Sequence, residues 1–426
     1  MKNILLLGNG FDLYYKLPTK YADFLYVVSF LQANRDKTFE TIGDIFSEDA
    51  LQKSDPFIKV CYETHKAAYD TTPLNKELTE EIITLTKDNI WFAYLQKVFN
   101  KDVGWIDFEK EIGVVLGCFE QAFKKRTVFS FNSNEKHLKC ILQHFKFFVD
   151  KPSSGVAIGA YAINKDYCKE DPIGSDHIII NTEKVVDKLY EELCNISKAL
   201  TLYLKCFVES TYGRLKNDGA CGRLEFFSHM ERAITFNYTN TYESLYFNNS
   251  AFHIHGSTNG EIVLGINSDE SDTIENINTT FVCFKKYFQR TLFDTDSEYL
   301  RWIKGFVDSK LPYRLFTMGH SLDITDKDII EDLFRNAKEI IVLYHSIDSK
   351  ISYIKNLIEI FGKTDFEMLK NEKNLIFVSL NQDFSSLKRT LSEESWADLH
   401  AMLSGEVGEE RVLILFILTL DFCPLL

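Results

Sequence analysis

Proline is scarce in this chain, and none of its cysteines forms a C-x-x-C pair. Only 7 of the 426 residues are Pro, so we expect long helices with few interruptions. The 9 cysteines are scattered and odd in number, unlike the paired ligands of a structural zinc site. They indicate reduced thiols in a cytoplasmic protein, and no metal is expected.

Long basic runs and membrane-length apolar runs are also missing. The net charge is −14, and without clustered Lys and Arg a groove for stable nucleic acid is disfavoured, whereas a small pocket for one nucleotide is not. No signal peptide is expected, because residues 8–12 interrupt the first apolar run. The apolar residues 412–420 are fewer than the about 20 that a bilayer requires, so they indicate a core strand or helix.

Short apolar runs alternate with helical patterns, mainly in the second half of the chain. We interpret as strands residues 3–7, 233–236, 251–254, 262–266, 313–318, 339–344 and 375–380. The clearer helical patterns are residues 20–31, 79–87, 91–99, 108–123, 183–212, 326–335 and 351–361, and residues 126–180 look irregular. This alternation predicts an α/β, Rossmann-like fold with a mostly parallel sheet and helices on both faces.

The first strand must find its partners far away in the sequence. One parallel strand cannot stand alone, so we expect residues 3–7 in the same sheet as the strands of the second half. Residues 1–30 and 225–426 would then form a nucleotide-binding core, and residues 31–224 a mainly helical insertion or lid.

A glycine-rich turn follows the first strand. Gly8 and Gly10 would let the backbone approach a phosphate, whose oxygens could accept from backbone N–H groups. A tight structural turn capped by Asn9 or Asp12 explains the same residues equally well. Leu13 replaces the third glycine of G-x-G-x-x-G, which disfavours a hydride-transferring dehydrogenase.

Polar residues follow two later strands. Asn237 comes directly after an apolar run, at the carboxyl end where open α/β sheets bind ligands, although it could also simply start a loop. If the next strand includes His253 and His255, both side chains lie on one face. Gly256 leaves room beside His255, which is a candidate general base, while a buried structural pair is the alternative.

Another glycine follows the strand expected at residues 313–318. Gly319 and Ser321 precede a helix, where a ribose or phosphate could bind. Thr325 and Asp328 have the spacing of a capping box, so we interpret Asp326 and Asp328 as parts of the helix start. By the same reasoning Thr19 is the expected N-cap of the helix at residues 20–31.

These motifs together resemble the AbiH family of bacteriophage abortive-infection proteins. The turn at residues 8–12, with residues 17–19 and 21–25, is similar to the N-terminal signature of that family. Blocks similar to its later motifs are Trp105 with Asp107 and Glu109, and residues 236–239, 253–256 and 319–321. The resemblance implies a role in phage defence.

The order of the motifs also resembles the sirtuin-like NAD-binding fold. That resemblance implies that Asn237 holds the nicotinamide ribose or a water and that His255 is the catalytic base. The residues that it and the motifs suggest for nucleotide binding are Gly8, Asn9, Gly10, Phe11, Asp12, Gly256, Gly319, His320, Ser321 and Asp323. The four zinc-binding cysteines of protein deacylases are missing, which disfavours deacylation.

The expected function is therefore phage defence through glycosidic hydrolysis of NAD, which releases nicotinamide. A non-catalytic nucleotide sensor or scaffold is the alternative, and a nuclease or RNA-targeting toxin is disfavoured by the charge. We expect the protein to act in the cytoplasm on a nucleotide ligand, in response to a phage-derived trigger. A homo-oligomer is compatible with the sequence. Neither a membrane nor stably bound nucleic acid is expected as a partner.

Overall fold

The computed structural model describes most of the chain. The described residues are 1–100, 106–125, 136–150, 155–158, 161–169, 179–218, 225–246, 250–267, 279–295, 298–372 and 375–380. Trp105 and the apolar residues 412–420 lie outside them. Within these ranges, no helix combines the length and the apolar character needed to cross a membrane.

Six parallel strands form the central sheet, in the order β11-β10-β9-β1-β7-β8. Their bounds are β1 (Lys2–Leu7), β7 (Arg232–Thr235), β8 (Ala251–His253), β9 (Tyr313–Met318), β10 (Glu339–Tyr344) and β11 (Leu375–Ser379). If the six strands are numbered 1 to 6 in chain order and the sheet is read from its β8 edge, the order is 3-2-1-4-5-6, which is that of a Rossmann fold. The predicted α/β fold is confirmed, and so is the pairing of the first strand with strands of the second half.

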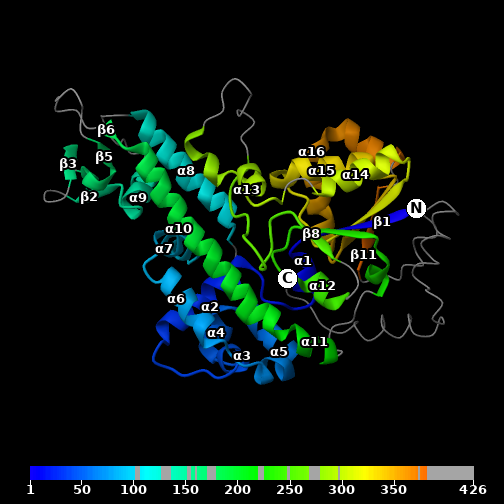
Figure 1. Cartoon of the computed structure of the whole chain (residues 1–426), viewed down its shortest axis with the longest axis horizontal. Coiled ribbons are helices and arrows are strands. Elements are labelled where there is room, and N and C mark those ends of the chain that lie inside the picture. Colours follow the sequence, from blue (N-terminus) through cyan, green and yellow to red (C-terminus); the bar gives the residue numbers. More distant parts are fainter. Residues whose placement is uncertain are drawn as a thin grey trace.

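Both faces of the sheet are buried, as its continuous apolar runs require. In β1, Leu5 and Leu7 belong to one hydrophobic core, whereas Ile4 and Leu6 belong to the other. Residues from α14 (Glu298–Asp308), α15 (Lys327–Asn336) and α16 (Ile347–Glu372) complete the second core. Figure 1 shows these three helices together beside the sheet.

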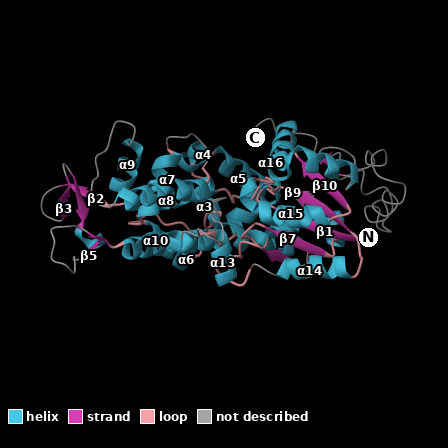
Figure 2. Ribbon diagram, turned by 90° about the horizontal axis from the view of Figure 1, so that it is seen from above, coloured by secondary structure: helices cyan, strands magenta, loops and turns pink. Residues whose placement is uncertain are grey.

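The other core continues into the helices between β1 and β7. These are α1 (Gly10–Tyr14), α2 (Tyr21–Ala33), α3 (Ile42–Phe46), α4 (Asp49–Ser54), α5 (Pro56–Thr71), α6 (Lys76–Thr86), α7 (Ile90–Phe99), α8 (Phe108–Lys125), α9 (Lys136–His144), α10 (Thr182–Tyr203) and α11 (Tyr212–Asp218). An asparagine caps the N-terminus of three of these helices by accepting a hydrogen bond from a backbone N–H of the first turn: Asn75 in α6, Asn89 in α7 and Asn181 in α10. Figure 2 shows the central sheet at one end of the molecule and most of these helices beyond it.

Residues 126–180 contain more regular structure than the sequence indicated. Besides α9, the described part holds an antiparallel sheet of β2 (Phe148–Asp150), β4 (Tyr161–Asn164) and β3 (Gly155–Ile158). A second, two-stranded sheet pairs β5 (Cys168–Lys169) with β6 (Ile179–Ile180). Such short strands give too few residues for a periodic pattern.

Three other local predictions were wrong. Residues 262–266 form no strand and make only isolated bridges, at Ile262 and Ile266. The helix expected over 183–212 is interrupted by a π-helical turn, η3 (Leu204–Val208), and a 3-10 turn, η4 (Glu209–Thr211). The N-cap of α2 is Lys20, whose N–H donates to Asp23 at 2.9 Å, while the Thr19 hydroxyl donates to Asn9 at 2.6 Å.

Several short helices lie in the second half of the chain. They are η5 (Glu225–His229), α12 (Thr241–Leu245), η6 (Thr279–Phe284), α13 (Lys286–Leu292) and η7 (Ile324–Asp326). The pairing of Leu7 with both Thr235 and Met318 puts three strand ends level with one another. Gly8, Phe236 and Gly319 therefore begin their loops side by side.

Candidate functional site

A cavity of about 390 Å³ opens at this edge of the sheet. The sheet order reverses between β1 and β9, and Rossmann-like folds bind ligands at that point. Residues of the strand-end loops line the cavity, together with Tyr21 of α2, Glu109 of α8 and Leu200 of α10. Helices that come between β1 and β7 in the sequence therefore form part of its wall.

Most of the residues expected at the site do line this cavity. They are Gly8, Asn9, Asp12, Asn237, His255, Gly319, His320, Ser321 and Asp323. Gly10, Phe11 and Gly256 are not part of its lining. The Phe11 ring is buried against Tyr15, and Gly256 makes a tight turn in which a Cβ would lie 2.0 Å from the Glu261 carbonyl oxygen.

The two glycine turns pack against each other. Gly10 N–H donates to the Gly319 carbonyl at 2.8 Å, and Phe11 N–H donates to the Gly8 carbonyl at 2.9 Å. A Cβ on Gly8 or Gly10 would come within 2.6 Å of the backbone of residues 319–320, and Gly319 has a φ of 71°. The amides of Gly10 and Phe11 are thus already used, and close backbone packing is what requires these glycines.

Asp12 lines the cavity and is fully buried. Thr239 donates its hydroxyl to Asp12 Oδ2 at 2.6 Å, whereas Oδ1 has no hydrogen-bond partner among the described residues. Burial raises the pKa of Asp12 to about 7, although the hydroxyls of Thr239 and Thr241 oppose this. Near neutral pH the carboxyl group can therefore both donate and accept a proton.

A buried ion-pair network joins the helices to the strand-end loops. Lys286 Nζ lies 2.7 Å from Glu109 Oε2 and 3.2 Å from Asp326 Oδ1, and its side chain is 3% exposed. Burial raises the pKa of Glu109 to about 7 even though Lys286 is adjacent. At Asp326 burial acts in the same direction, but Lys286 and two histidines outweigh it and hold the pKa well below its usual range.

Those two histidines are His255 and His320. The Nε2 atoms of His255 and His320 lie 3.5 Å and 3.4 Å from the carboxylate of Asp326. Leu322 N–H donates to His320 Nδ1 at 2.9 Å, so Nε2 carries the ring proton and faces the carboxylate. Burial and the charge of Lys286 lower the pKa of His255 to about 4, which keeps that ring neutral at physiological pH.

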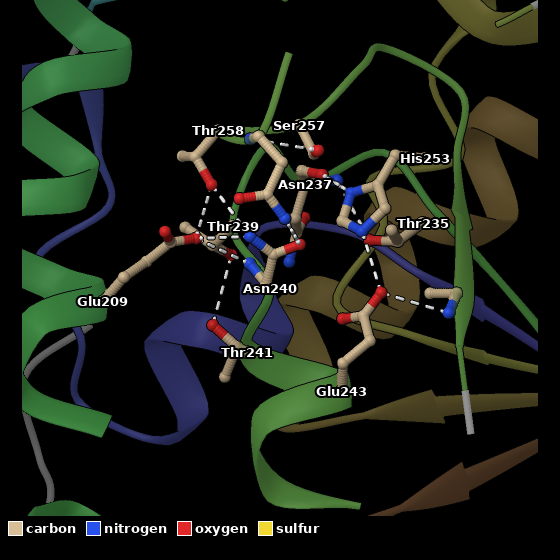
Figure 3. A network of polar contacts seen from close by, with 12 residues as sticks. Glu209, Thr235, Asn237, Thr239, Asn240, Thr241, Glu243, His253, Ser257 and Thr258 are labelled. Atoms are coloured by element: carbon tan, nitrogen blue, oxygen red, sulfur yellow. Dashed lines mark hydrogen bonds and ion pairs between the residues drawn. The ribbon is translucent and has the colours of Figure 1, made fainter. Parts of the chain in front are cut away.

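Asn237 is held through its backbone. Its N–H donates to Thr235 Oγ1 at 3.0 Å, and its carbonyl oxygen accepts from His253 Nδ1 at 2.9 Å. Figure 3 shows His253 between this carbonyl and Glu243. The side-chain Oδ1 of Asn237, a cavity-lining residue, is buried without a partner in the described structure.

The loop after Asn237 is fixed by a second group of contacts, also drawn in Figure 3. Glu209 Oε1 accepts from the backbone and side-chain nitrogens of Asn240, each at 2.9 Å, and from Thr258 Oγ1 at 2.7 Å. Glu209 directly follows the π-helical turn η3. The π-helical turn therefore helps to place Glu209 where it binds the loop after β7.

Sequence reasoning missed the most highly charged part of the site. Asp326 was interpreted as part of a helix start, but its carboxylate lies between Lys286, His255 and His320. The expected Thr325–Asp328 capping box is absent, since Asp323 caps the preceding turn and Asp326 makes no side-chain cap. Lys286 carried no motif, and only its buried position reveals its role.

His253 and His255 also differ from expectation. β8 ends at His253, so the two histidines are not neighbours on one strand face. His253 contacts Glu243 and Asn237, while His255 contacts Asp326 and the ring of Phe236, with 5.1 Å between ring centroids. Val263 N–H donates to the His255 carbonyl at 2.8 Å, so residues 262–266 support this turn without forming a strand.

The cavity is lined by acids and aromatic rings. Its acidic residues are Asp12, Asp107, Glu109, Asp323 and Asp326, and its one Lys or Arg among the described residues is Lys286. Such an acidic lining stabilises a positively charged group better than it stabilises a phosphate group. In the same described ranges, no three His, Cys, Asp or Glu side chains are grouped to hold a metal ion.

Comparison with known proteins assigns the family. A family model described as bacteriophage abortive infection AbiH matches residues 4–346, which include every motif that lines the cavity. No curated protein and no solved structure matches the chain. Because the matched region covers most of the chain, this protein belongs to the AbiH family of bacteriophage abortive-infection proteins.

Proposed function

We propose that the protein acts in phage defence by binding NAD⁺ in this cavity and hydrolysing the glycosidic bond to nicotinamide. Two buried polar atoms without partners among the described residues carry the proposal, namely Asp12 Oδ1 and Asn237 Oδ1. Buried polar atoms usually have partners, so unpaired atoms around one cavity indicate a missing ligand. A cavity of about 390 Å³ lies in the size range of small-molecule sites.

The charges around the cavity suit this reaction. When the bond between ribose C1′ and the pyridinium nitrogen breaks, nicotinamide leaves as a neutral molecule with the bonding electrons, and positive charge develops on the ribose. The carboxylates of Asp12, Glu109 and Asp326 would stabilise that charge. A water molecule then attacks C1′ and loses one proton.

Asn237 and His255 have the principal roles in this scheme. Asn237 would orient the ribose or the attacking water through its free Oδ1. His255 is neutral and its Nε2 faces Asp326, so the lone pair that accepts the proton of water would be on Nδ1. General-base assistance of this kind contributes about 10²–10⁴-fold to the rate.

The direct test is to incubate the full chain with NAD⁺ and measure free nicotinamide, with and without extract of phage-infected cells. We expect release by wild type and a loss of at least about 10²-fold in His255→Ala and Asn237→Ala. His229→Ala, an exposed histidine outside the cavity, is the matched control and should keep full activity. Absence of nicotinamide from wild type under both conditions would disprove hydrolysis.

A nucleotide sensor is the second candidate. Glu109 belongs to α8, which lies within residues 31–224, and it pairs with Lys286 of the core. A ligand that breaks this ion pair would change the contact between the helical lid and the core. A phage-derived trigger, action in the cytoplasm and assembly into a homo-oligomer are compatible with both functions. Calorimetric binding of NAD⁺ without any product over hours would favour the sensor.

A further inference from the structure

The contacts of His253 specify how many protons its ring carries. Nδ1 lies 2.9 Å from the Asn237 carbonyl oxygen, and Nε2 lies 2.9 Å from Glu243 Oε1. A carbonyl oxygen and a carboxylate oxygen can only accept hydrogen bonds. Both ring nitrogens must therefore donate, which makes the ring an imidazolium.

The surroundings favour this charged form. The side chain of His253 is 11% exposed, and burial alone would lower its pKa. The hydrogen bond and charge of Glu243 outweigh burial, and the Asn237 carbonyl and Glu209 add to them, so the pKa is raised. Asp12 is a third acidic group near enough for its charge to interact with the ring, and His253 lowers the pKa of Asp12.

Glu243 is itself held in place for this pairing. It belongs to α12, and its Oε1 also accepts the Ala251 N–H of β8 at 3.1 Å. Figure 3 shows this chain of contacts running from α12 through the ring to the loop after β7. At its end lies Asn237, whose backbone N–H and carbonyl are both engaged and whose Oδ1 is free.

We propose that His253 is a positioning residue that, as an imidazolium between Glu243 and the Asn237 carbonyl, fixes the Asn237 side chain for the ligand. The ring touches no atom that would react, so it acts only through Asn237. Because the Glu243 carboxylate favours the proton on Nε2, deprotonation of the imidazolium removes the hydrogen bond from Nδ1 to the Asn237 carbonyl, and Asn237 is then held only by its N–H to Thr235. The proposal rests on the proposed function only in taking a nucleotide as the ligand.

The first test needs no nucleotide. In the full chain labelled with ¹⁵N-histidine, both ring nitrogens of His253 should carry protons near neutral pH, with a titration midpoint above the usual value of about 6.5. Glu243→Gln should lower that midpoint by about one to three units. His253→Asn assigns the signal and His229→Gln is the control. A neutral His253 ring below pH 7 would overturn the proposal.

The second test separates positioning from a purely structural role. The side-chain amide signal of Asn237, assigned by its absence in Asn237→Ala, should shift with the same midpoint as His253. If it does not move while His253 titrates, the positioning role is wrong, whether or not the protein binds nucleotide.

The third test uses NAD⁺ itself, by calorimetry. Wild type should bind it on the order of tenfold to a hundredfold more tightly than His253→Asn, and this ratio should approach one as pH rises through the midpoint. The ratio cancels the titration of Glu109, and measuring it in an Asp12→Asn background removes the titration of Asp12, whose ionised form His253 stabilises. If wild type binds no NAD⁺ but the His253 and Asn237 signals titrate together, the proposed function fails and the positioning role of His253 stands. A ratio of the two NAD⁺ affinities that does not change with pH would contradict that role.

Discussion

The backbone N–H of Gly10 donates to the carbonyl oxygen of Gly319 at 2.8 Å, which joins the turn after β1 to the turn after β9. The two turns meet at the point where the sheet order reverses. The glycines of this motif therefore build the floor of the crevice, and the polar side chains around them are left to recognise the ligand.

Gly10→Ala should destabilise the protein by about 1–3 kcal/mol or more, because the new Cβ would lie 2.6 Å from the backbone of Gly319. Urea unfolding followed by tryptophan fluorescence measures this. Gly305→Ala in α14 is the control: no atom lies within 4 Å of its Cβ, so the better helix former should add up to about 1 kcal/mol. Equal effects of the two substitutions would contradict the packing argument.

Asp12→Asn should raise the free energy of unfolding at alkaline pH. The pKa of Asp12 is about 7 in the fold against an ordinary value of 3.8 for an aspartate, so ionisation opposes folding as pH rises from about 4 to 7. The full effect is on the order of 4 kcal/mol above pH 7 and vanishes below about pH 4. Stability curves of both proteins at several pH values give the difference.

Asp44→Asn serves as a control of opposite sign. Asp44 accepts the N–H groups of Glu40 and Thr41, and these bonds lower its pKa. Its stabilising effect is present above the unfolded pKa and is lost as pH falls through the folded value. The variant should therefore be less stable than wild type at neutral pH and equal to it in acid. A similar pH dependence in the two variants would refute both assignments.

Lys286→Met should destabilise the protein by about 3–5 kcal/mol at neutral pH, because it leaves the buried Glu109 and Asp326 without their counter-ion. Adding Glu109→Gln should restore part of the loss. Lys198→Met, which breaks an exposed pair with Glu81, should change stability by less than about 1 kcal/mol. Thermal and urea unfolding give both numbers, and a small effect of Lys286→Met would argue against the buried network.

The acidic lining should prefer a cation to a neutral molecule of the same shape. We expect 1-methylnicotinamide to bind more tightly than nicotinamide, and its affinity to increase through about pH 7 as Asp12 and Glu109 ionise. Asp12→Asn should reduce the preference, whereas Glu80→Gln on the surface should not. Calorimetry with both ligands decides, and a preference for the neutral compound would show that the carboxylates do not face the ligand.

Much of the fold was readable from short patterns. The runs now seen as β1, β7, β9, β10 and β11 are mostly apolar because both sheet faces are covered, and their positions were predicted to within a residue or two. Residues 262–266 have the same composition but only support the His255 turn. Composition cannot distinguish a strand from a buried loop, because both fill the core.

The site was readable only in part, for a related reason. Asn237, His255 and Gly319 could be identified because each follows a strand end, where Rossmann-like sheets bind ligands. Asp326 and Lys286 lie 40 positions apart, Lys286 belongs to no motif, Asp326 was assigned only to a helix start, and nothing local indicates that their charges meet. The division into residues 1–30 with 225–426 and residues 31–224 stays a prediction.

The sequence alone determined the AbiH resemblance, the α/β class and the strand ends that carry Asn237, His255 and Gly319. Tertiary structure decided that Gly10 and Gly319 hold each other, that Asp326 joins two histidines to Lys286, and that His253 holds Asn237. Local patterns record which backbone conformations and buried faces a segment favours. The protonation and pairing of a buried side chain depend on which distant groups exclude water from it, and folding alone decides which groups those are.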